Sequence, residues 1–470
     1  MKILARYFKS ARGALFITCA TLASSCAVVD GGVQNVTSMS AVANAARSNT
    51  TDAGWAGYAE PVTGGALASM QRTYTVRNRR ELVAALAAHD KALAHEAKIV
   101  RIDGVIDLSV DDSNLSLTES DYKDPAFSWD KYAAAFSPAT WGRSKPEGSQ
   151  EIARQQSARN QEKVVLIRVG SNTTLVGVGE KAILKNGSLM LLDVENVIIR
   201  NLAFEDAYDY FPAWDPADNG HGEWNAAYDN ISVVSSRRVW IDFCTFSDGL
   251  RPDRLNRTLL DRPMQFHDGL VDVIRGSDLV TISNSHFRDH DKGLLIGNSD
   301  SRKDDAGRLR VTLHNNWFEN VKERSPRVRY GQVHVYNNLY TATIGADYDY
   351  GYSIGVGIGS SIFAEANAFI LERHGSTRIF RWLRGDRLAI RDNVQLIDGQ
   401  WRMLAVDPPS AGAIISASAT WRVPYLYQLS SASDLTTRLR GHAGAGTSAA
   451  RERVAIEHKL VFATNTKPSI

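Results

Sequence analysis

The sequence predicts an all-β solenoid with long loop excursions and a few short helices. An eight-residue pattern recurs six times, beginning at positions 197, 239, 280, 311, 333 and 362. Its first residue is Val or Ile, its third is Ile, Leu, Val or Ala, and its eighth is always Phe or Tyr. Such repeats are typical of stacked β-coils, because one coil cannot bury its apolar face alone. A β-sandwich whose strands are alike by chance is the alternative, and the constant aromatic position argues against it.

Residues 1–52 precede the solenoid and look like an export signal followed by a linker. An apolar stretch at 14–23 is too short to span a bilayer comfortably, and basic residues precede it. We therefore expect a signal peptide over residues 1–27 and a secreted protein, with a lipid anchor on Cys26 as an alternative. Residues 28–52 are rich in Ala, Ser, Asn and Thr and indicate a flexible linker. The basic residues of the signal are Lys2, Arg6, Lys9 and Arg12.

The composition argues against a partner bound by overall charge. The 470 residues carry a net charge of +2, so no global field favours nucleic acid or an anionic membrane. No segment after the signal is apolar enough to span a membrane. Cys19 and Cys26 fall in the signal, and Cys244 lies in an apolar strand pattern where a buried inert thiol is expected. Without a disulfide framework the chain must be held by its core, and we expect a monomer.

The main body is expected over residues 53–450, with 451–470 as a C-terminal extension. Residues 72–90 indicate a strand and then an amphipathic helix. Residues 108–160 are polar, carry scattered aromatic residues, and include much of an expected helix at 151–163. Excursions of this kind would form a wall beside the solenoid. The wall and the solenoid would then enclose a groove for a long ligand.

Three aspartates are candidate ligands of a hard cation. In "HDGLVDV", Asp268 and Asp272 are four residues apart and share one face of a strand, while Val271 and Val273 point to the other face. Asp229 comes 39 residues before Asp268 and so about one enlarged coil away. Converging carboxylates suit Ca²⁺. By spacing alone, a solvated acidic patch is the more common explanation.

The segment "KERSPRVRYG" concentrates three arginines in six positions. Arg327 and Arg329 share a strand face, and a bend at 325–326 could turn Arg324 toward them. Arginine clusters bind carboxylates with paired hydrogen bonds, so the segment predicts an anion site. Lys292 lies among acidic residues and by itself indicates only a surface turn.

Together these motifs resemble those of the secreted calcium-dependent pectate lyases, over about residues 53–450. The resemblance implies a right-handed, single-stranded parallel β-helix with Ca²⁺ as cofactor. It implies that the calcium ligands are Asp229, Asp268 and Asp272, that the catalytic base is Arg324, and that the groups binding the uronate carboxylate are Lys292 and Arg329. The segments that carry it are "GWAGYAE" (54–60), "SNTTLVGVG" (171–179), "YDNISV" (228–233), "VWIDFCTFSDG" (239–249), "RPMQFHDGLVDVIRGSDLVTISNSHFRDHDKGLLIGNSDS" (262–301) and "VTLHNNWFENVKERSPRVRYGQVHVYNNLY" (311–340).

The implied reaction is eliminative cleavage of (1→4)-α-D-galacturonan, or polygalacturonate. Ca²⁺ between the substrate carboxylate and the aspartates would stabilise an enolate-like transition state. Arg324 would take the C5 proton and the C4 oxygen would leave, which gives a 4,5-unsaturated galacturonosyl end. Because arginine is normally always protonated, this role requires electropositive, desolvated surroundings.

Two residues depart from the motifs of this family. Phe243 and Asn315 stand where the family often has histidine, and both lie in the repeated octets, so they affect packing more than chemistry.

"NGHGEW" (219–224) contains the Gly-His-Gly of polygalacturonases, but their aspartate motifs are not found around it. Pectin lyases replace the calcium carboxylates by arginine. A catalytically inactive pectate-binding protein is disfavoured by the intact Arg324.

Overall fold

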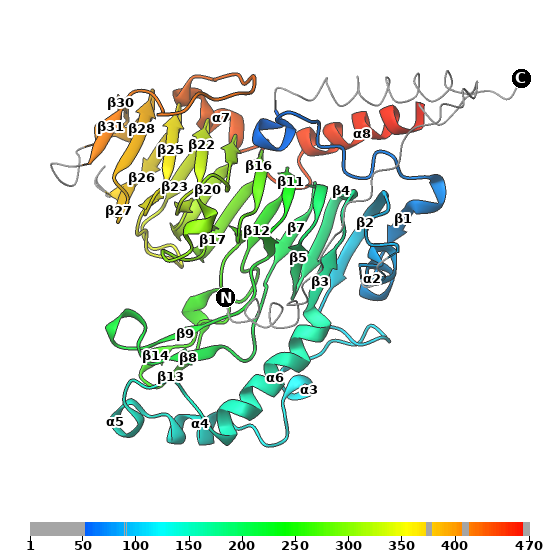
Figure 1. The fold of residues 1–470 in the computed structure, drawn as a ribbon, viewed down its shortest axis with the longest axis vertical. Helices are drawn as coiled ribbons and strands as arrows, with labels where there is room; N and C mark the ends of the chain where they lie inside the picture. The colour runs from blue at the N-terminus through cyan, green and yellow to red at the C-terminus, as the bar shows by residue number, and fades with distance from the viewer. Residues whose placement is uncertain (1–51, 89, 91, 373–377, 407–412, 464–470) are drawn as a thin grey trace, which may run out of the picture.

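The computed structural model describes residues 52–88, 90, 92–372, 378–406 and 413–463, and its fold is a parallel β-helix (Figure 1). The expected signal peptide, almost all of the linker and Cys26 lie outside the described residues. Among the described residues, two large sheets of 8 and 19 strands run along the helix. Almost all their strand pairs are parallel and join successive coils, which confirms the predicted all-β solenoid.

The 8-stranded sheet forms one face of the helix. In spatial order it contains β27 (Phe380–Leu383), β24 (Ile354–Gly357), β21 (Arg327–Val328), β18 (Leu294–Ile296), β15 (Val271–Ile274), β10 (Ile231–Val234), β5 (Ser188–Leu192) and β3 (Leu166–Val169). The 19-stranded sheet forms the remaining faces. It contains β1 (Thr73–Val76), β2 (Lys98–Asp107), β4 (Thr173–Lys185), β6 (Glu195–Arg200), β7 (Ala203–Glu205), β11 (Arg237–Asp242), β12 (Thr245–Ser247), β16 (Asp278–Ser283), β17 (His286–Lys292), β19 (Val311–His314), β20 (Trp317–Glu323), β22 (Gln332–Tyr336), β23 (Leu339–Ala342), β25 (Ser361–Glu365), β26 (Ala368–Leu371), β28 (Arg387–Arg391), β29 (Val394–Ile397), β30 (Gln400–Met403) and β31 (Ile414–Ser416).

The repeated octets stack in register, so the predicted ladders exist. The first residues of the six octets are partners in consecutive strand pairs, from Val197 to Ile362. The aromatic residues at the eighth position form a continuous stack with ring centroids 4.6–5.2 Å apart. These rings are Phe204, Phe246, Phe287, Phe318, Tyr340 and Phe369. The ladder places one aromatic side chain per coil in the core, where apolar burial stabilises the fold.

Asparagines shape the bend inside five of the six octets, at the fifth or the sixth position. At the fifth position the backbone is left-handed, with φ between 49° and 54° in all six octets. Asn tolerates this region well, but Phe243 and Ala366 occupy two of the six positions. At the sixth position, Asn316 Nδ2 donates to Asn338 Oδ1 and Asn338 Nδ2 donates to Asn367 Oδ1, each at 3.0 Å, which forms a buried ladder. Cys244 takes this position in its own coil and is a free thiol that is fully buried, as expected.

A polar excursion builds a second lobe beside the solenoid, as expected (Figure 1). It contains helix α6 (Ser149–Val165), which confirms the helix expected at 151–163. Aromatic side chains fill the core of this lobe, including Tyr132, Phe211 and Trp224. Its other elements are α3 (Glu119–Tyr122), α4 (Trp129–Ala135), α5 (Pro138–Trp141), β8 (Ala213–Asp215), β9 (Glu223–Asn225), β13 (Thr258–Leu259) and β14 (Arg262–Pro263).

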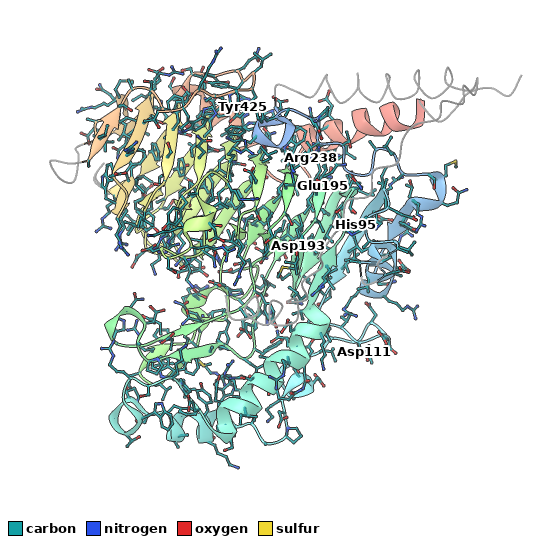
Figure 2. All side chains as sticks on the ribbon, in the orientation of Figure 1. His95, Asp111, Asp193, Glu195, Arg238 and Tyr425 are labelled. Atoms are coloured by element: carbon teal, nitrogen blue, oxygen red, sulfur yellow. The ribbon has the colours of Figure 1, made fainter. Side chains whose placement is uncertain are left out.

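Segments from the N-terminal and the C-terminal parts of the chain both pack on the solenoid. The expected strand and helix at 72–90 are β1 and α2 (Arg79–Leu86), whose N-cap Asn78 accepts a bond from the Glu81 amide. Figure 2 shows Tyr425 beside the N-terminal turn η1 (Gly54–Gly57), where its ring lies 5.5 Å from Trp55. The remaining 3₁₀ turns are η2 (Met70–Arg72), η3 (Asp218–Gly220), η4 (Asp253–Leu255), η5 (Lys303–Asp305) and η7 (Ala432–Asp434).

The C-terminal part of the chain folds back along the 19-stranded sheet. Helix α7 (Leu435–Leu439) packs on Leu339, and the amide of Gly446 donates to the Asn201 side chain. Helix α8 (Ser448–Ala463) follows, so residues 451–463 of the expected extension continue a helix that begins in the main body. No helix in the described part of the chain has both the length and the apolar character needed to cross a membrane.

Candidate active site

A cleft of about 790 Å³ lies between the 8-stranded sheet and helix α6. Five of the six site residues named from the sequence line it: Asp268, Asp272, Lys292, Arg324 and Arg329. Asp229, the sixth, lies directly beside them, because its Oδ1 accepts a bond from the Gly269 amide. The structure therefore gathers all six residues at one place.

Consecutive coils position these residues side by side. Asp272 lies in β15, with Ser232 of β10 and Leu295 of β18 as its register partners. Val271 and Val273 are fully buried on the opposite face, as the alternation predicts. Lys292 ends β17, and Arg324 follows β20 in the next coil. Residues that are tens of positions apart in the sequence therefore lie on neighbouring coils of the solenoid.

The three aspartates form a site with excess negative charge. Asp229 Oδ2 accepts from Ser232 Oγ at 2.6 Å, and Oδ1 accepts from the Gly269 amide at 3.0 Å. Burial, together with the negative charge of Asp268, raises the pKa of Asp229 to about 6. Burial and the charges of Asp229 and Asp268 raise the pKa of Asp272 well above its usual value. A bound cation stabilises the ionised form of carboxyl groups that raise each other's pKa in this way.

Gly269 leaves the space that brings two of these carboxylates together. A Cβ at this position would lie 2.8 Å from Asp229 Oδ1 and 3.2 Å from Asp272 Oδ1. Both oxygens therefore flank one point on the cleft floor. Two hard oxygen atoms at one point, with the charge of Asp268 near enough to raise the pKa of Asp229, fit Ca²⁺ by chemistry.

Lys292 and Arg324 place positive charge next to the carboxylates. Lys292 Nζ lies 3.5 Å from Asp268 Oδ1 and donates to Gln265 Oε1 at 2.7 Å. Although burial acts to raise the pKa of Asp268, the charges of Lys292 and Arg324 lower it on balance. Asp268 is consequently the carboxylate of the three that stays ionised most readily.

Arg324 and Arg329 are each held by a neighbouring carboxylate. Arg324 Nε donates to Glu323 Oε1 at 3.1 Å, and Arg329 Nε donates to Asp300 Oδ1 at 2.5 Å. Burial lowers the pKa of Arg324, but the charges of Glu323, Asp268 and Asp272 outweigh it, so the pKa is raised. With the aspartates uncompensated, Arg324 is firmly protonated.

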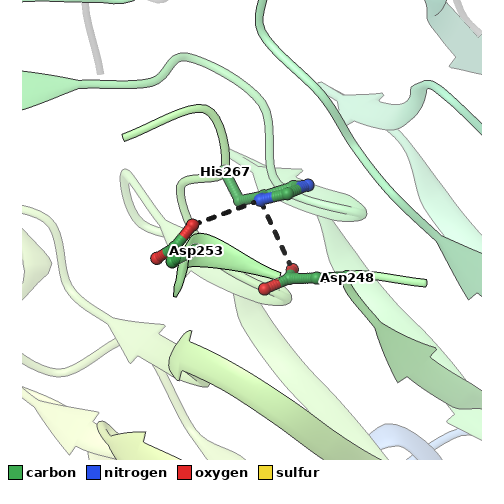
Figure 3. A group of neighbouring side chains, drawn as sticks. All are labelled: Asp248, Asp253 and His267. Carbon is green, nitrogen blue, oxygen red and sulfur yellow. Dashed lines mark hydrogen bonds and ion pairs between the residues drawn. The ribbon is translucent and has the colours of Figure 1, made fainter. Parts of the chain in front are cut away.

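A buried network contacts the backbone of Asp268, and sequence reasoning missed it. Figure 3 shows three of its members, Asp248, Asp253 and His267. His290 bridges Asp248 Oδ1 at 2.6 Å and the carbonyl oxygen of Asp268 at 3.1 Å. His267 lies 2.9 Å from Asp206, 3.5 Å from Asp253 and 3.8 Å from Asp248. The available signal was the histidine in each of the "HDG" and "HDK" motifs that surround the named residues.

Acidic and basic side chains face one another in this network, and the ligand atoms of Asp248, Asp253 and His267 lie within 4.8 Å of one another. Burial disfavours the charged form of His267, but Asp248, Asp206 and Asp253 raise its pKa to about 10. The pKa of His290 is also raised, because Asp248 outweighs its burial. His267, His290 and Arg251, which donates to Asp206 at 2.7 Å, therefore face the carboxylates of Asp206, Asp248 and Asp253. We treat the network as a support for the Asp268 backbone.

Helix α6 forms the wall expected from the excursion, but the residues that it places on the cleft were not named from the sequence. Arg154 donates to Glu151 at 2.8 Å and to the Phe211 carbonyl at 2.7 Å, which locks both side chains. Asp209 lines the cleft from the second lobe, and burial raises its pKa to about 6. His221 of the "NGHGEW" segment is about half exposed, pairs with Glu223 at 2.9 Å, and does not line this cleft.

A parallel β-helix with acidic and basic groups gathered in a lateral cleft is the architecture of β-helix polysaccharide lyases. The sequence profile described as pectate lyase matches residues 144–448. The chain is 39% identical over 394 residues to a pectate lyase of Bacillus subtilis (strain 168), covering 84% of this chain and 91% of that protein. The chain belongs to the pectate lyase family, whose members are polysaccharide lyases.

Other relatives agree with this assignment. Pectate lyase E of Dickeya dadantii (strain 3937) is 38% identical over 344 residues, which is 72% of this chain and 73% of that protein. The solved thermostable pectate lyase PL 47 has a TM-score of 0.80 and 40% identity, with 84% of this chain and 97% of that chain covered. A solved pectate lyase bound to a hexasaccharide has a TM-score of 0.78 and 38% identity over the same shares.

Proposed function

We propose that the protein is a calcium-dependent pectate lyase that cleaves polygalacturonate by β-elimination. The observation that carries the proposal is one cleft in which three aspartates, a lysine and two arginines meet, in a chain of the pectate lyase family. Asp229, Asp268 and Asp272 would hold Ca²⁺. When bound, the ion would neutralise the substrate carboxylate and stabilise negative charge that develops at C5.

Lys292 and Arg329 would bind and orient the same uronate. Both line the cleft, and their positive charge would stabilise the enolate-like transition state. Arginine suits this role because its guanidinium binds a carboxylate through two parallel hydrogen bonds. The Asp300 carboxylate that now pairs with Arg329 keeps the guanidinium in place until the substrate arrives.

Arg324 would act as the base. It would accept the C5 proton while the C5–H electrons form the C4–C5 double bond and the glycosidic C4–O bond breaks. The departing oxygen would then take a proton from solvent. The charges of Asp268 and Asp272 are part of what holds the Arg324 proton, so compensation of their charge favours its loss, and alkaline pH favours it further.

The family and the intact site disfavour the other functions considered. A pectin lyase would carry arginine at the calcium carboxylates, and all three are aspartate here. An inactive binding protein has no need for the buried arginine at the base position. We also propose that residues 1–27 direct export, that 28–52 form a linker, and that 53–450 act as a monomeric catalytic body outside the cell. Lipidation of Cys26 stays a prediction.

A single assay tests the proposal. The protein is incubated with polygalacturonate at alkaline pH, with Ca²⁺ or with a chelator, and ultraviolet absorbance and reducing ends are followed together. We expect both to rise with Ca²⁺ and neither to rise with chelator, because elimination leaves a double bond conjugated to the carboxylate. Reducing ends without absorbance would indicate a hydrolase, and no change in folded protein would indicate a binding protein.

A further inference from the structure

Glu323 is the last residue of β20 and lies beside the proposed base. Its register partner in the preceding coil is Lys292, the last residue of β17. In an extended strand, consecutive side chains point to opposite faces, so those of Glu323 and Arg324 would point apart. Arg324 has a left-handed backbone with φ 63°, which ends this alternation. The bend lets the two side chains meet, and Arg324 Nε donates to Glu323 Oε1 at 3.1 Å.

The backbone around Arg324 is held by both neighbouring coils. The Arg324 carbonyl oxygen accepts from the Leu294 amide at 2.5 Å, and the Ser325 amide donates to the Ser353 carbonyl oxygen at 2.7 Å. A Cβ at Gly293 would lie 2.7 Å from the same Arg324 oxygen, so the glycine allows this close approach. With the main chain fixed in this way, the direction of the guanidinium depends on the contacts of its side chain.

Glu323 supplies a contact that sets this direction. The side chains of Arg324 and Glu323 are only 22% and 23% exposed, so their ion pair is better shielded from solvent than a surface pair. Arg381 is a second cation near Glu323, but it lies 4.0 Å away with a 58% exposed side chain and competes weakly. Because the bond to Glu323 occupies Nε, the terminal nitrogens of Arg324 are the atoms left to meet a ligand in the cleft that this residue lines.

The bond at Nε also determines which nitrogen can act as a base. A neutral guanidine has lost one proton, and the nitrogen that lost it carries the free lone pair. Arg324 Nε must keep its proton in order to donate to Glu323. The proton is therefore lost from a terminal nitrogen.

We propose that Glu323 is a positioning residue, which keeps the proton on Arg324 Nε so that a terminal nitrogen of Arg324 accepts the C5 proton of the uronate. This inference rests on the proposed function, which makes Arg324 the base. In the step, the C5–H bond breaks and its proton forms an N–H bond at the terminal nitrogen. The electrons of the C5–H bond form the C4–C5 double bond as the C4–O bond breaks, and the terminal nitrogen later returns its proton to water.

The same carboxylate opposes the reaction through its charge. Burial lowers the pKa of Arg324, and the charge of Glu323 is the first of the influences that raise it. Glu323 therefore favours turnover through its hydrogen bond and disfavours it through its charge, and substitutions can separate the two effects. The other charged or titratable groups around Arg324 stay the same in such variants; they are Asp268, Asp272, Lys292, Arg327, Tyr352 and Arg381.

The test compares Glu323→Gln and Glu323→Ala with the parent protein in steady-state kinetics on polygalacturonate at saturating Ca²⁺. Gln keeps an oxygen that can accept from Nε but has no charge, whereas Ala removes both. For Glu323→Ala we expect kcat to fall about 10- to 100-fold with little change in KM, because a misplaced base lowers the rate more than the affinity.

Glu323→Gln gives a readout that a purely structural role would not move. We expect its kcat at alkaline pH to stay within about threefold of the parent value. The rising limb of kcat against pH should move to lower pH by about one unit, because an anion that favours the protonated guanidinium has been removed.

Glu319→Gln and Glu319→Ala are the matched controls. Glu319 lies on the same strand, does not line the cleft, and pairs with His286 at 2.9 Å with a 31% exposed side chain. Both control variants should keep the kcat and the pH profile of the parent. Circular dichroism and thermal melts check the folding of all four variants.

The outcomes distinguish this inference from the proposed function. A wild type that makes no unsaturated uronate overturns the proposed function and this inference with it. An active wild type together with a folded Glu323→Ala protein of unchanged kcat overturns this inference alone. The inference also fails if Glu323→Gln loses as much kcat as Glu323→Ala, because an oxygen acceptor at this place would then not position the base. Should Glu323→Ala fail to fold, the pH profile of the near-isosteric Glu323→Gln decides, and an unmoved limb overturns the inference.

Discussion

At the scale of single residues, Arg324 carries the sharpest expectation. We expect Arg324→Ala and Arg324→Lys to lose turnover of polygalacturonate by about 10²–10⁴-fold with the fold intact, because loss of a positioned base typically costs this much. The measurement is the rate of absorbance increase with Ca²⁺, with circular dichroism as the check on folding. Arg387→Ala removes an exposed arginine outside the cleft and should be neutral. Near-normal activity in folded Arg324→Ala would refute the assignment.

The aspartates should affect calcium affinity more than stability. Asp272→Asn removes one charge from a hard-cation site, so we expect calcium affinity to fall about tenfold or more by calorimetry with substrate present. Burial and repulsion already disfavour the ionised form of Asp272. The metal-free variant should therefore unfold at the same denaturant concentration as the wild type, or a higher one. Asp112→Asn, at an exposed position, is the control. Unchanged affinity in both Asp268→Asn and Asp272→Asn would show that neither is a ligand.

The raised pKa of Asp229 predicts how pH controls the site. In the metal-free protein this carboxyl is protonated below about pH 6, so a cation must displace a proton there. We expect apparent calcium affinity to weaken by about tenfold for each pH unit below 6 and to level off above it. Proton release, from calorimetry in two buffers, checks the mechanism. Over the same window, this group makes the metal-free fold less stable as pH rises, because the folded state holds the proton more tightly. An affinity that is flat from pH 4 to 7 would contradict the shift.

At the scale of elements, we expect the aromatic ladder to stabilise the fold and the left-handed bend at Phe243 to destabilise it. Phe287 is fully buried, between Phe246 at 4.8 Å and Phe318 at 4.9 Å. We expect Phe287→Ala to lower the free energy of unfolding by about 3–5 kcal/mol, as other large-to-small core changes do. Phe243→Asn replaces a bulky residue at φ 51° with the residue that other octets use, and should raise stability by about 1 kcal/mol. Denaturant titration measures the free energy of unfolding of both variants. If Phe287→Ala lowered it by no more than Phe243→Asn changes it, the aromatic ladder would not be a main source of stability.

At the scale of the whole molecule, the C-terminal segment ties the last coils to the first. Gly446 has φ 72°, and a Cβ there would lie 2.3 Å from the Glu180 carbonyl oxygen of β4. We expect Gly446→Ala to lower the free energy of unfolding by about 1–3 kcal/mol, because neither the backbone angle nor the space suits a side chain. Gly441→Ala is matched, since its Cβ would meet nothing within 4 Å. Thermal melts give the comparison, and similar melting of both variants would show that this contact is not needed.

The solenoid could be predicted because its determinants are local and periodic. Val197 and Phe204 sit at fixed places in an octet, and the same places return in every coil, so stacking follows from the pattern alone. The roles assigned to Asp268, Asp272 and Arg324 came from motif resemblance, since spacing alone favoured a solvated acidic patch. The octets align Phe246 with Phe287, but the pairing of His290 with Asp248 was not read from them, because both residues lie past the eighth position, where the coils differ in length.

By itself, the sequence determined the repeating coils and the aromatic ladder, because these depend on identity and short spacing, and its motifs supplied the set of proposed site residues. Only the tertiary structure decided how the excursion forms a wall with α6, and how Asp229 and Asp272 meet across Gly269. It alone brought Arg381 of a later coil to 4.0 Å from Glu323, the neighbour of Arg324. The physical reason is that loop lengths vary from coil to coil, so which side chains become neighbours is settled when the coils stack.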